Sequence, residues 1–284
     1  MPKPCGQNAK VGLLYTTCHD NRYADILPPA TLLYLLKYDP SLILDDLHDT
    51  MDVGPVSLDD AKDRMAYLMQ SETVARWMGG PLPSTLIING QDAVPSPSPA
   101  TSLFSAMLLR ALDRSQHSPV ISWFCDQRVH GSVAQMLLSL IGQIVYRFSD
   151  DVDPPAISQA GHLNNVGDLT HFLLLCLEAQ LERSAVYCII DAIATYEDRR
   201  RSKDLCYAIR KLAGLTRASG GRRTRYPFKL LVSDPVGALD VSAALRPTNA
   251  VVLDLPDYVE GAMYELNELD VLEHTKRCLT LEGE

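Results

Sequence analysis

At 284 residues, the chain is long enough for one large α/β domain, or for one domain with an extra helical segment. Hydrophobic residues make up 46% of the sequence and charged residues 21%, a balance that excludes an intrinsically disordered chain. The formal net charge of −9 argues against a broad phosphate-binding surface, so we expect no nucleic-acid partner.

The seven cysteines are scattered and form no Cys-x-x-Cys pair, so neither a zinc site nor a disulfide framework is indicated. Their odd number is typical of a reducing compartment. The N-terminus has no secretory signal pattern, and the longest apolar run, Phe172 to Leu177, is much shorter than the ~20 residues of a membrane span. We therefore expect an intracellular, cytoplasmic protein that makes no membrane contact.

Residues 1–80 are predicted to form a helical N-terminal segment. The pattern of apolar residues predicts helices at residues 30–37, 58–69 and 71–78. The first helix follows Pro28-Pro29, and the last is ended by Gly79-Gly80-Pro81.

From residue 81 the pattern changes, and residues 81–284 are assigned to a single domain in which strands alternate with helices. The predicted strands are residues 85–89, 120–125, 185–190, 228–233 and 250–254. The predicted helices are residues 100–112, 132–148, 168–183, 202–218, 236–245 and 258–278, the third of them capped by Asn165 or Asp168. Strands that are continuous apolar runs are buried on both faces, so the pattern predicts a three-layer α/β fold with a parallel sheet between helices.

Asp191 is the sharpest candidate for a functional residue, because it ends the third predicted strand. In P-loop NTPases an Asp at this place binds the Mg²⁺ of the nucleotide, directly or through water. The simpler alternative is that Asp191 caps the turn after the strand, as Asp commonly does. We favour the turn cap, because no Lys is available nearby to bind phosphate.

The loop after the first strand, residues 90–99, is where such a fold would bind phosphate. The chain has no Gly-x-x-x-x-Gly-Lys-Ser/Thr motif, and the prolines of this loop remove N–H donors. If a nucleotide does bind, the candidate residues are Gly90, Ser98, Thr101 and Ser102, together with Asp191 for the metal.

No catalytic residue is assigned, because Ala194 and Thr195 stand where a residue that activates water is expected. Glu197 and Asp198 follow, and we expect both to begin a helix and to complement its dipole. Asp234, at the end of the fourth predicted strand, is explained equally well by a polar sensor position and by a turn.

In this order, these segments resemble the nucleotide-binding domain of fungal NACHT-type proteins, which belong to the STAND class of signalling P-loop NTPases. The resemblance covers about residues 71–255. Residues 187–192, Tyr-Cys-Ile-Ile-Asp-Ala, resemble the Walker B strand, and residues 229–235, Lys-Leu-Leu-Val-Ser-Asp-Pro, the sensor strand. The resemblance implies strand order 5-1-4-3-2, ATP or GTP binding and nucleotide-controlled oligomerisation. Members of the family usually have Gly-Lys-Ser/Thr at the positions that residues 97–101 occupy here, and this chain lacks that motif.

We therefore expect a degenerate P-loop NTPase-like domain, a pseudoenzyme that has no cofactor and acts as a NACHT-like regulatory or protein-interaction module. Its partner would be another protein or further copies of the chain. One alternative is an atypical NTPase that binds Mg-ATP or Mg-GTP through Asp191, with the missing cation supplied by Lys203, Arg199 or a neighbouring subunit. The other is a structural subunit of a larger assembly.

Overall fold

The structure is a computed structural model that describes residues 28–52, 58–91, 99–115, 118–147, 165–216, 225–256, 259 and 268–280. Ser98 and most of the loop after the first strand lie outside these residues, as does the start of the helix predicted at 258–278. The helix is present from Glu268 to Thr280.

Five parallel strands form a single sheet, in the order β2-β3-β4-β1-β5. Their bounds are β1 (Ser84–Asn89), β2 (Val120–Phe124), β3 (Val186–Asp191), β4 (Phe228–Asp234) and β5 (Val251–Asp254). Read from the opposite edge, this is the predicted order 5-1-4-3-2, so the three-layer α/β fold is confirmed.

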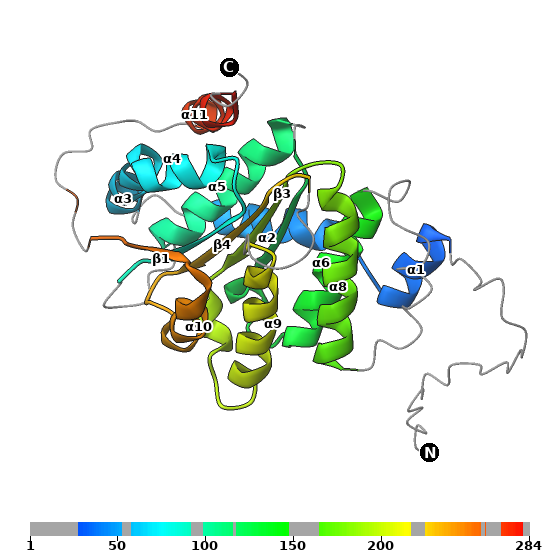
Figure 1. Cartoon of the computed structure of the whole chain (residues 1–284). Helices are drawn as coiled ribbons and strands as arrows, with labels where there is room; N and C mark the ends of the chain where they lie inside the picture. The colour runs from blue at the N-terminus through cyan, green and yellow to red at the C-terminus, as the bar shows by residue number, and fades with distance from the viewer. Residues whose placement is uncertain are drawn as a thin grey trace, which may run out of the picture.

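Two hydrophobic clusters cover the two faces of the sheet (Figure 1). One face is covered by α1 (Pro29–Leu36), α6 (Val133–Arg147), α8 (Val166–Leu181), α9 (Ser202–Gly214) and α10 (Leu239–Leu245). The other is covered by α3 (Leu58–Gln70), α4 (Glu72–Gly79), α5 (Ala100–Ser115) and α11 (Glu268–Thr280), with α2 (Ser41–Met51) packed beside them. Successive residues of each inner strand contribute to opposite clusters, because side chains alternate along a strand.

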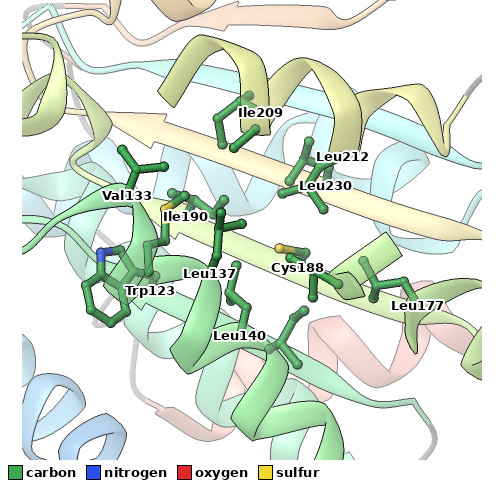
Figure 2. Packing of buried hydrophobic residues seen from close by; sticks show 14 of the residues in the cluster. Trp123, Val133, Leu137, Leu140, Leu177, Cys188, Ile190, Ile209, Leu212 and Leu230 are labelled. Carbon is green, nitrogen blue, oxygen red and sulfur yellow. The ribbon is translucent and has the colours of Figure 1, made fainter. Parts of the chain in front are cut away.

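The first of these clusters shows why the strands have continuous apolar sequences (Figure 2). Cys188 and Ile190 of β3 lie between Leu137 of α6 and Ile209 of α9, and all four side chains are essentially inaccessible to solvent. Tyr187 and Ile189 point to the opposite cluster. A strand buried on both faces is therefore mostly apolar along its length, as the sequence pattern predicts.

The helices at residues 58–79 share their cluster with β1, α5 and α11. Trp77 of α4 packs edge-on against Tyr187 of β3, with ring centroids 5.8 Å apart, and the Tyr187 hydroxyl donates a hydrogen bond to the carbonyl oxygen of Met78. This part of the N-terminal segment therefore covers the sheet and shares its core.

Two details of the predicted elements are decided by the structure. The cap of α8 is Asn165, whose side chain accepts a hydrogen bond from the Asp168 backbone N–H at 2.9 Å. The prediction that every strand is buried on both faces is wrong for β5, where Val251 and Val252 are about half exposed. β5 lies at the edge of the sheet and pairs with β1 alone, so it lacks a full set of neighbours.

None of the helices in the described residues is long and apolar enough to cross a membrane.

Candidate functional site

The candidate site lies where the carboxyl ends of β1, β3 and β4 meet the N-terminus of α5. β1 lies between β4 and β5, and the next strand in the sequence, β2, lies at the far edge of the sheet on the β4 side. The strand order therefore reverses next to β1. In open parallel sheets, ligands bind outside the carboxyl ends of the strands where the strand order reverses. Asp191 and the start of α5, Thr101 and Ser102, therefore belong to the region where a ligand is expected.

The Asp191 carboxylate is enclosed by hydroxyl groups, and the residue is only 1% exposed. Its Oδ1 accepts a hydrogen bond from the Ser233 hydroxyl at 2.6 Å. The Ser233 hydroxyl is in turn 2.8 Å from the Ser105 hydroxyl of α5. Ser105, Ser233 and Asp191, which we call the hydroxyl network, thus connect α5, β4 and β3 through buried polar contacts.

The surroundings of Asp191 disfavour its charge. Burial raises the pKa of Asp191 from its ordinary value of 3.8 to about 6, while the hydroxyls of Ser102, Ser233 and Ser105 lower it in part. Burial is the largest cause, so the carboxylate is ionised at neutral pH only at a cost in free energy.

Two hydroxyls at the start of α5 stand out because they are buried and unsatisfied. Within the described residues, neither Thr101 Oγ1 nor Ser102 Oγ makes a hydrogen bond of regular geometry. Ser102 lies near enough to Asp191 to lower its pKa. Buried polar groups in native proteins are nearly always paired. Ser102 has the Asp191 carboxylate as its neighbour, so Thr101 Oγ1 is the hydroxyl at this end of α5 that has no partner among the described residues.

The turn after β3 is held by Asp234, and the prediction that Asp191 caps it is wrong. Among the described contacts of the Asp191 side chain, none goes to the backbone of this turn. Asp234 accepts the backbone N–H of Ala194 at 2.5 Å, and also those of Val236 and Gly237 at 2.9 and 2.7 Å. One carboxylate therefore fixes the turns after β3 and β4, which supports the turn interpretation of Asp234.

Glu197 and Asp198 serve different helices. Asp198 accepts the backbone N–H groups of Arg200 and Arg201 just before α9, as expected. Glu197 instead accepts the backbone N–H of Val241, in the first turn of α10. The prediction that Glu197 begins the helix that follows it is wrong. Its partner, Val241, is distant in the sequence and is brought close by the fold.

Gly90 has a structural explanation. A Cβ added there would lie 2.4 Å from the carbonyl oxygen of Pro235 and 2.7 Å from its Cα, closer than such contacts allow. The Gly90 N–H also donates to the carbonyl oxygen of Asp234 at 2.6 Å. The chain leaving β1 therefore needs a glycine to pass against the chain leaving β4, whether or not a nucleotide binds.

Arg64 of α3 supplies a cation at the end of β1 that sequence reasoning missed. Its guanidinium donates hydrogen bonds to the carbonyl oxygens of Gly90 and, at 3.1 Å, of Pro256. The residue is 6% exposed and lies on the apolar side of α3, near Leu68. A charged residue inside the apolar stripe of a predicted helix was the available signal.

The cations proposed from the sequence lie elsewhere. Arg199 and Lys203 are exposed. Their neighbour Arg201 donates hydrogen bonds to the carbonyl oxygens of Val129, Gly131 and Thr195, at 2.8 to 3.1 Å, and stacks over the ring of Tyr196 at 4.4 Å. Its guanidinium thus holds the loops after β2 and β3 together.

The side chains around Asp191 could supply some of the ligands of a metal ion, but they are poorly suited to bind a polyphosphate. Across the described ranges, no group of three or more His, Cys, Asp or Glu side chains is placed to hold a metal ion. A cation at Asp191 would have to rely on one carboxylate with the hydroxyls of Thr101 and Ser102. Asp126 lies close enough to both Asp191 and Asp234 for its negative charge to raise the pKa of each.

No known family model matches the chain, and no curated protein matches it either. The resemblance to NACHT domains therefore stays a prediction from the sequence, while the parallel α/β fold is established by the structure.

Proposed function

We propose that the chain is a catalytically inactive regulatory or protein-interaction module built on a P-loop-like fold. The observation that carries this proposal is the state of Asp191. Its carboxylate is buried and already accepts a hydrogen bond from Ser233, whereas a Mg²⁺ ligand must face the nucleotide.

The charge balance at the carboxyl ends of the strands supports the same proposal. A nucleoside triphosphate needs an ammonium or guanidinium group against its phosphates. Arg64 is the cation recorded beside Gly90 in the described structure, and its guanidinium is engaged with two carbonyl oxygens. A triphosphate would meet Asp191 and Asp234 there, both carboxylates, without a compensating charge from the start of α5.

One observation favours the second candidate function, an atypical NTPase. The Ser102 hydroxyl, at the N-terminus of α5, lies close enough to Asp191 to lower its pKa, and the adjacent Thr101 hydroxyl has no partner among the described residues. In P-loop NTPases a hydroxyl at this place and a carboxylate at the end of a neighbouring strand hold Mg²⁺ together. Asp191 and the hydroxyls of Thr101 and Ser102 would hold the metal, which would supply positive charge against the phosphates.

A phosphate-release assay with Mg-ATP and Mg-GTP distinguishes the two functions. The module predicts background release for the natural protein, equal to that of the Asp191→Asn variant. It also predicts that light scattering gives the same molar mass with and without nucleotide. Release well above background that disappears in Asp191→Asn would reject the module and support the NTPase.

A further inference from the structure

A hollow of the molecule lies beyond the carboxyl end of β2, and neither Asp191 nor α5 lines it. It is a pocket of about 660 Å³ between the α1–α2 connection, the short helix η2 (Asp126–Arg128) and one side of α6. Small-molecule sites typically enclose about 300–1,000 Å³. We call this hollow the β2-end pocket. Its size suits a ligand of drug-like dimensions.

One wall of the β2-end pocket is apolar. It is formed by Leu36 at the end of α1, Leu138 of α6 and Trp123 of β2, with Leu42 and Ile43 opposite. Figure 2 shows Trp123 at the margin of the hydrophobic cluster, beside Val133. An aliphatic chain or a flat ring placed against this wall would leave water without disturbing the core.

The polar wall is organised around Arg128. Its Nε donates to Asp46 Oδ2 at 3.2 Å, and its Nη2 lies 2.8 Å from Asp46 Oδ1 and donates to the carbonyl oxygen of Leu42 at 3.0 Å. The guanidinium carbon is 6.0 Å from the centre of the Trp123 ring. Among the described contacts of Arg128, none uses Nη1, so a fixed guanidinium lines the pocket with two N–H donors to spare.

Of the other charged groups that line the pocket, the carboxylates of Asp39 and Asp126 accept hydrogen bonds, and the basic side chains have no partner among the described residues. Asp39 accepts hydrogen bonds from the backbone and hydroxyl of Ser41, and Asp126 accepts one from the Thr195 hydroxyl. Within the described part of the chain, the exposed side chains of Lys37 and His130 make neither a hydrogen bond nor an ion pair. The positively charged donors that have no partner among the described residues are thus Nη1 of Arg128 and the ammonium group of Lys37.

We propose that the β2-end pocket binds an amphipathic monoanion, a molecule with an apolar ring or chain and a single carboxylate or sulfonate. Nη1 of Arg128 would donate to the anionic oxygens, with Lys37 nearby, while Trp123 and Leu138 contact the apolar body. The carboxylates of Asp39 and Asp126 in the lining oppose further negative charge, so a polyphosphate is disfavoured.

Titration of the full chain with anilinonaphthalene sulfonate, an aromatic monoanion, tests this proposal. The chain has two tryptophans, so the Trp77→Phe variant leaves Trp123 as the sole tryptophan donor for energy transfer. We expect saturable binding of one probe per chain with strong transfer from Trp123. Mg-ATP in large excess should leave the bound probe in place.

Three substitutions assign the binding to the pocket. Arg128→Met should weaken it about tenfold or more, since a hydrogen bond to a charged group is lost. Because that change also unpairs Asp46, Lys37→Gln provides an exposed substitution that should weaken binding about twofold to threefold without affecting the fold. Lys203→Gln, an exposed lysine on α9, is the matched control and should leave affinity unchanged.

Absence of saturable binding would overturn the proposal, and so would binding that neither Arg128→Met nor Lys37→Gln weakens. Displacement of the probe by Mg-ATP would contradict the monoanion class. Neither Asp191 nor any residue of α5 lines the pocket. A negative result in this binding test would therefore leave the proposed function unaffected.

Discussion

The carboxylate of Asp191 determines how the candidate site is interpreted. A buried acid whose charge is disfavoured can serve in catalysis, as a proton donor, or it can be a fixed part of a polar core. Here its recorded hydrogen bond comes from Ser233, which also contacts Ser105, so the acid connects three elements of the core. The energetic consequence can be measured directly.

Replacement of Asp191 by Asn should stabilise the protein at neutral pH. The folded pKa of about 6 is higher than the ordinary value of 3.8, so Asp191 supports folding fully below about pH 4. That contribution is lost as the pH rises through 6. The difference corresponds to about 3 kcal/mol, and Asn carries no charge at any pH.

Urea unfolding of both proteins from about pH 4 to about pH 7 checks this prediction. The free energy of unfolding of Asp191→Asn, relative to the natural protein, should rise with pH across this interval. A relative stability that falls as the pH rises would mean that the ionised carboxylate is favoured in the fold.

Gly90→Ala should destabilise the protein by about 1–3 kcal/mol, because the added methyl group would clash with the backbone of Pro235. Gly214→Ala is the matched control. A Cβ there meets nothing within 4 Å, and Ala favours a helix, so stability should stay equal or rise by up to about 1 kcal/mol. Chemical denaturation measures both. Equal stability of the two variants would show that Gly90 is not required by packing.

The roles of Gly90 and Arg64 show what the sequence could not predict at the site. A phosphate loop and a close backbone approach both favour glycine, so the residue type alone cannot separate them. Arg64 lies 26 residues before Gly90, and nothing local links the two. The hydrogen bonds of Asp234 and Glu197 likewise depend on the neighbouring turn or helix that the fold supplies.

Among the elements, the contact between α4 and α11 joins segments that are far apart in the sequence. Gly79, at the end of α4, lies so close to α11 that an added Cβ would be 2.3 Å from the carbonyl oxygen of Cys278. Val271 and Cys278 of α11 are buried in the same cluster as Trp77 and Met78 of α4. The last described helix, α11, thus packs over α4 and α5 and completes the hydrophobic cluster on their side of the sheet.

Gly79→Ala should therefore loosen α11. The carbonyl of Cys278 belongs to a helix backbone and cannot rotate away, so the helix must shift as a unit. Hydrogen exchange should become faster in α11 than in β3, because β3 is an inner strand held between β2 and β4.

Glu273→Gln, on the exposed side of α11, is the control and should change exchange little, since its ion pair with Arg277 is fully solvated. Unchanged protection of α11 in Gly79→Ala would contradict this account of the contact.

The elements themselves were largely predictable. Four strands are rich in apolar residues because both of their faces are buried, and the helices between them show one apolar side. The strand order came from the resemblance to NACHT domains and not from the pattern. The β2-end pocket was not predicted, since it forms where the α1–α2 connection crosses the end of a distant strand.

For the molecule as a whole, the fold and the proposed function rest on different kinds of evidence. Two clusters on either side of one parallel sheet establish the architecture. Function depends on whether the carboxyl ends of β1 and β3 can hold a metal-bound triphosphate, because folds of this kind support many activities. The overall charge of −9 also opposes a polyanion at a site without local cations.

Thermal unfolding of the full chain with and without Mg-ATP tests this claim most directly. A ligand at 100 times its dissociation constant stabilises the native state by about 2.7 kcal/mol, which raises Tm by about 5–10 °C for a domain of this size. We predict no change in Tm at about 1 mM Mg-ATP, a concentration that would reveal any site of about 10 μM affinity. A rise of several degrees that is absent in Asp191→Asn would contradict the account.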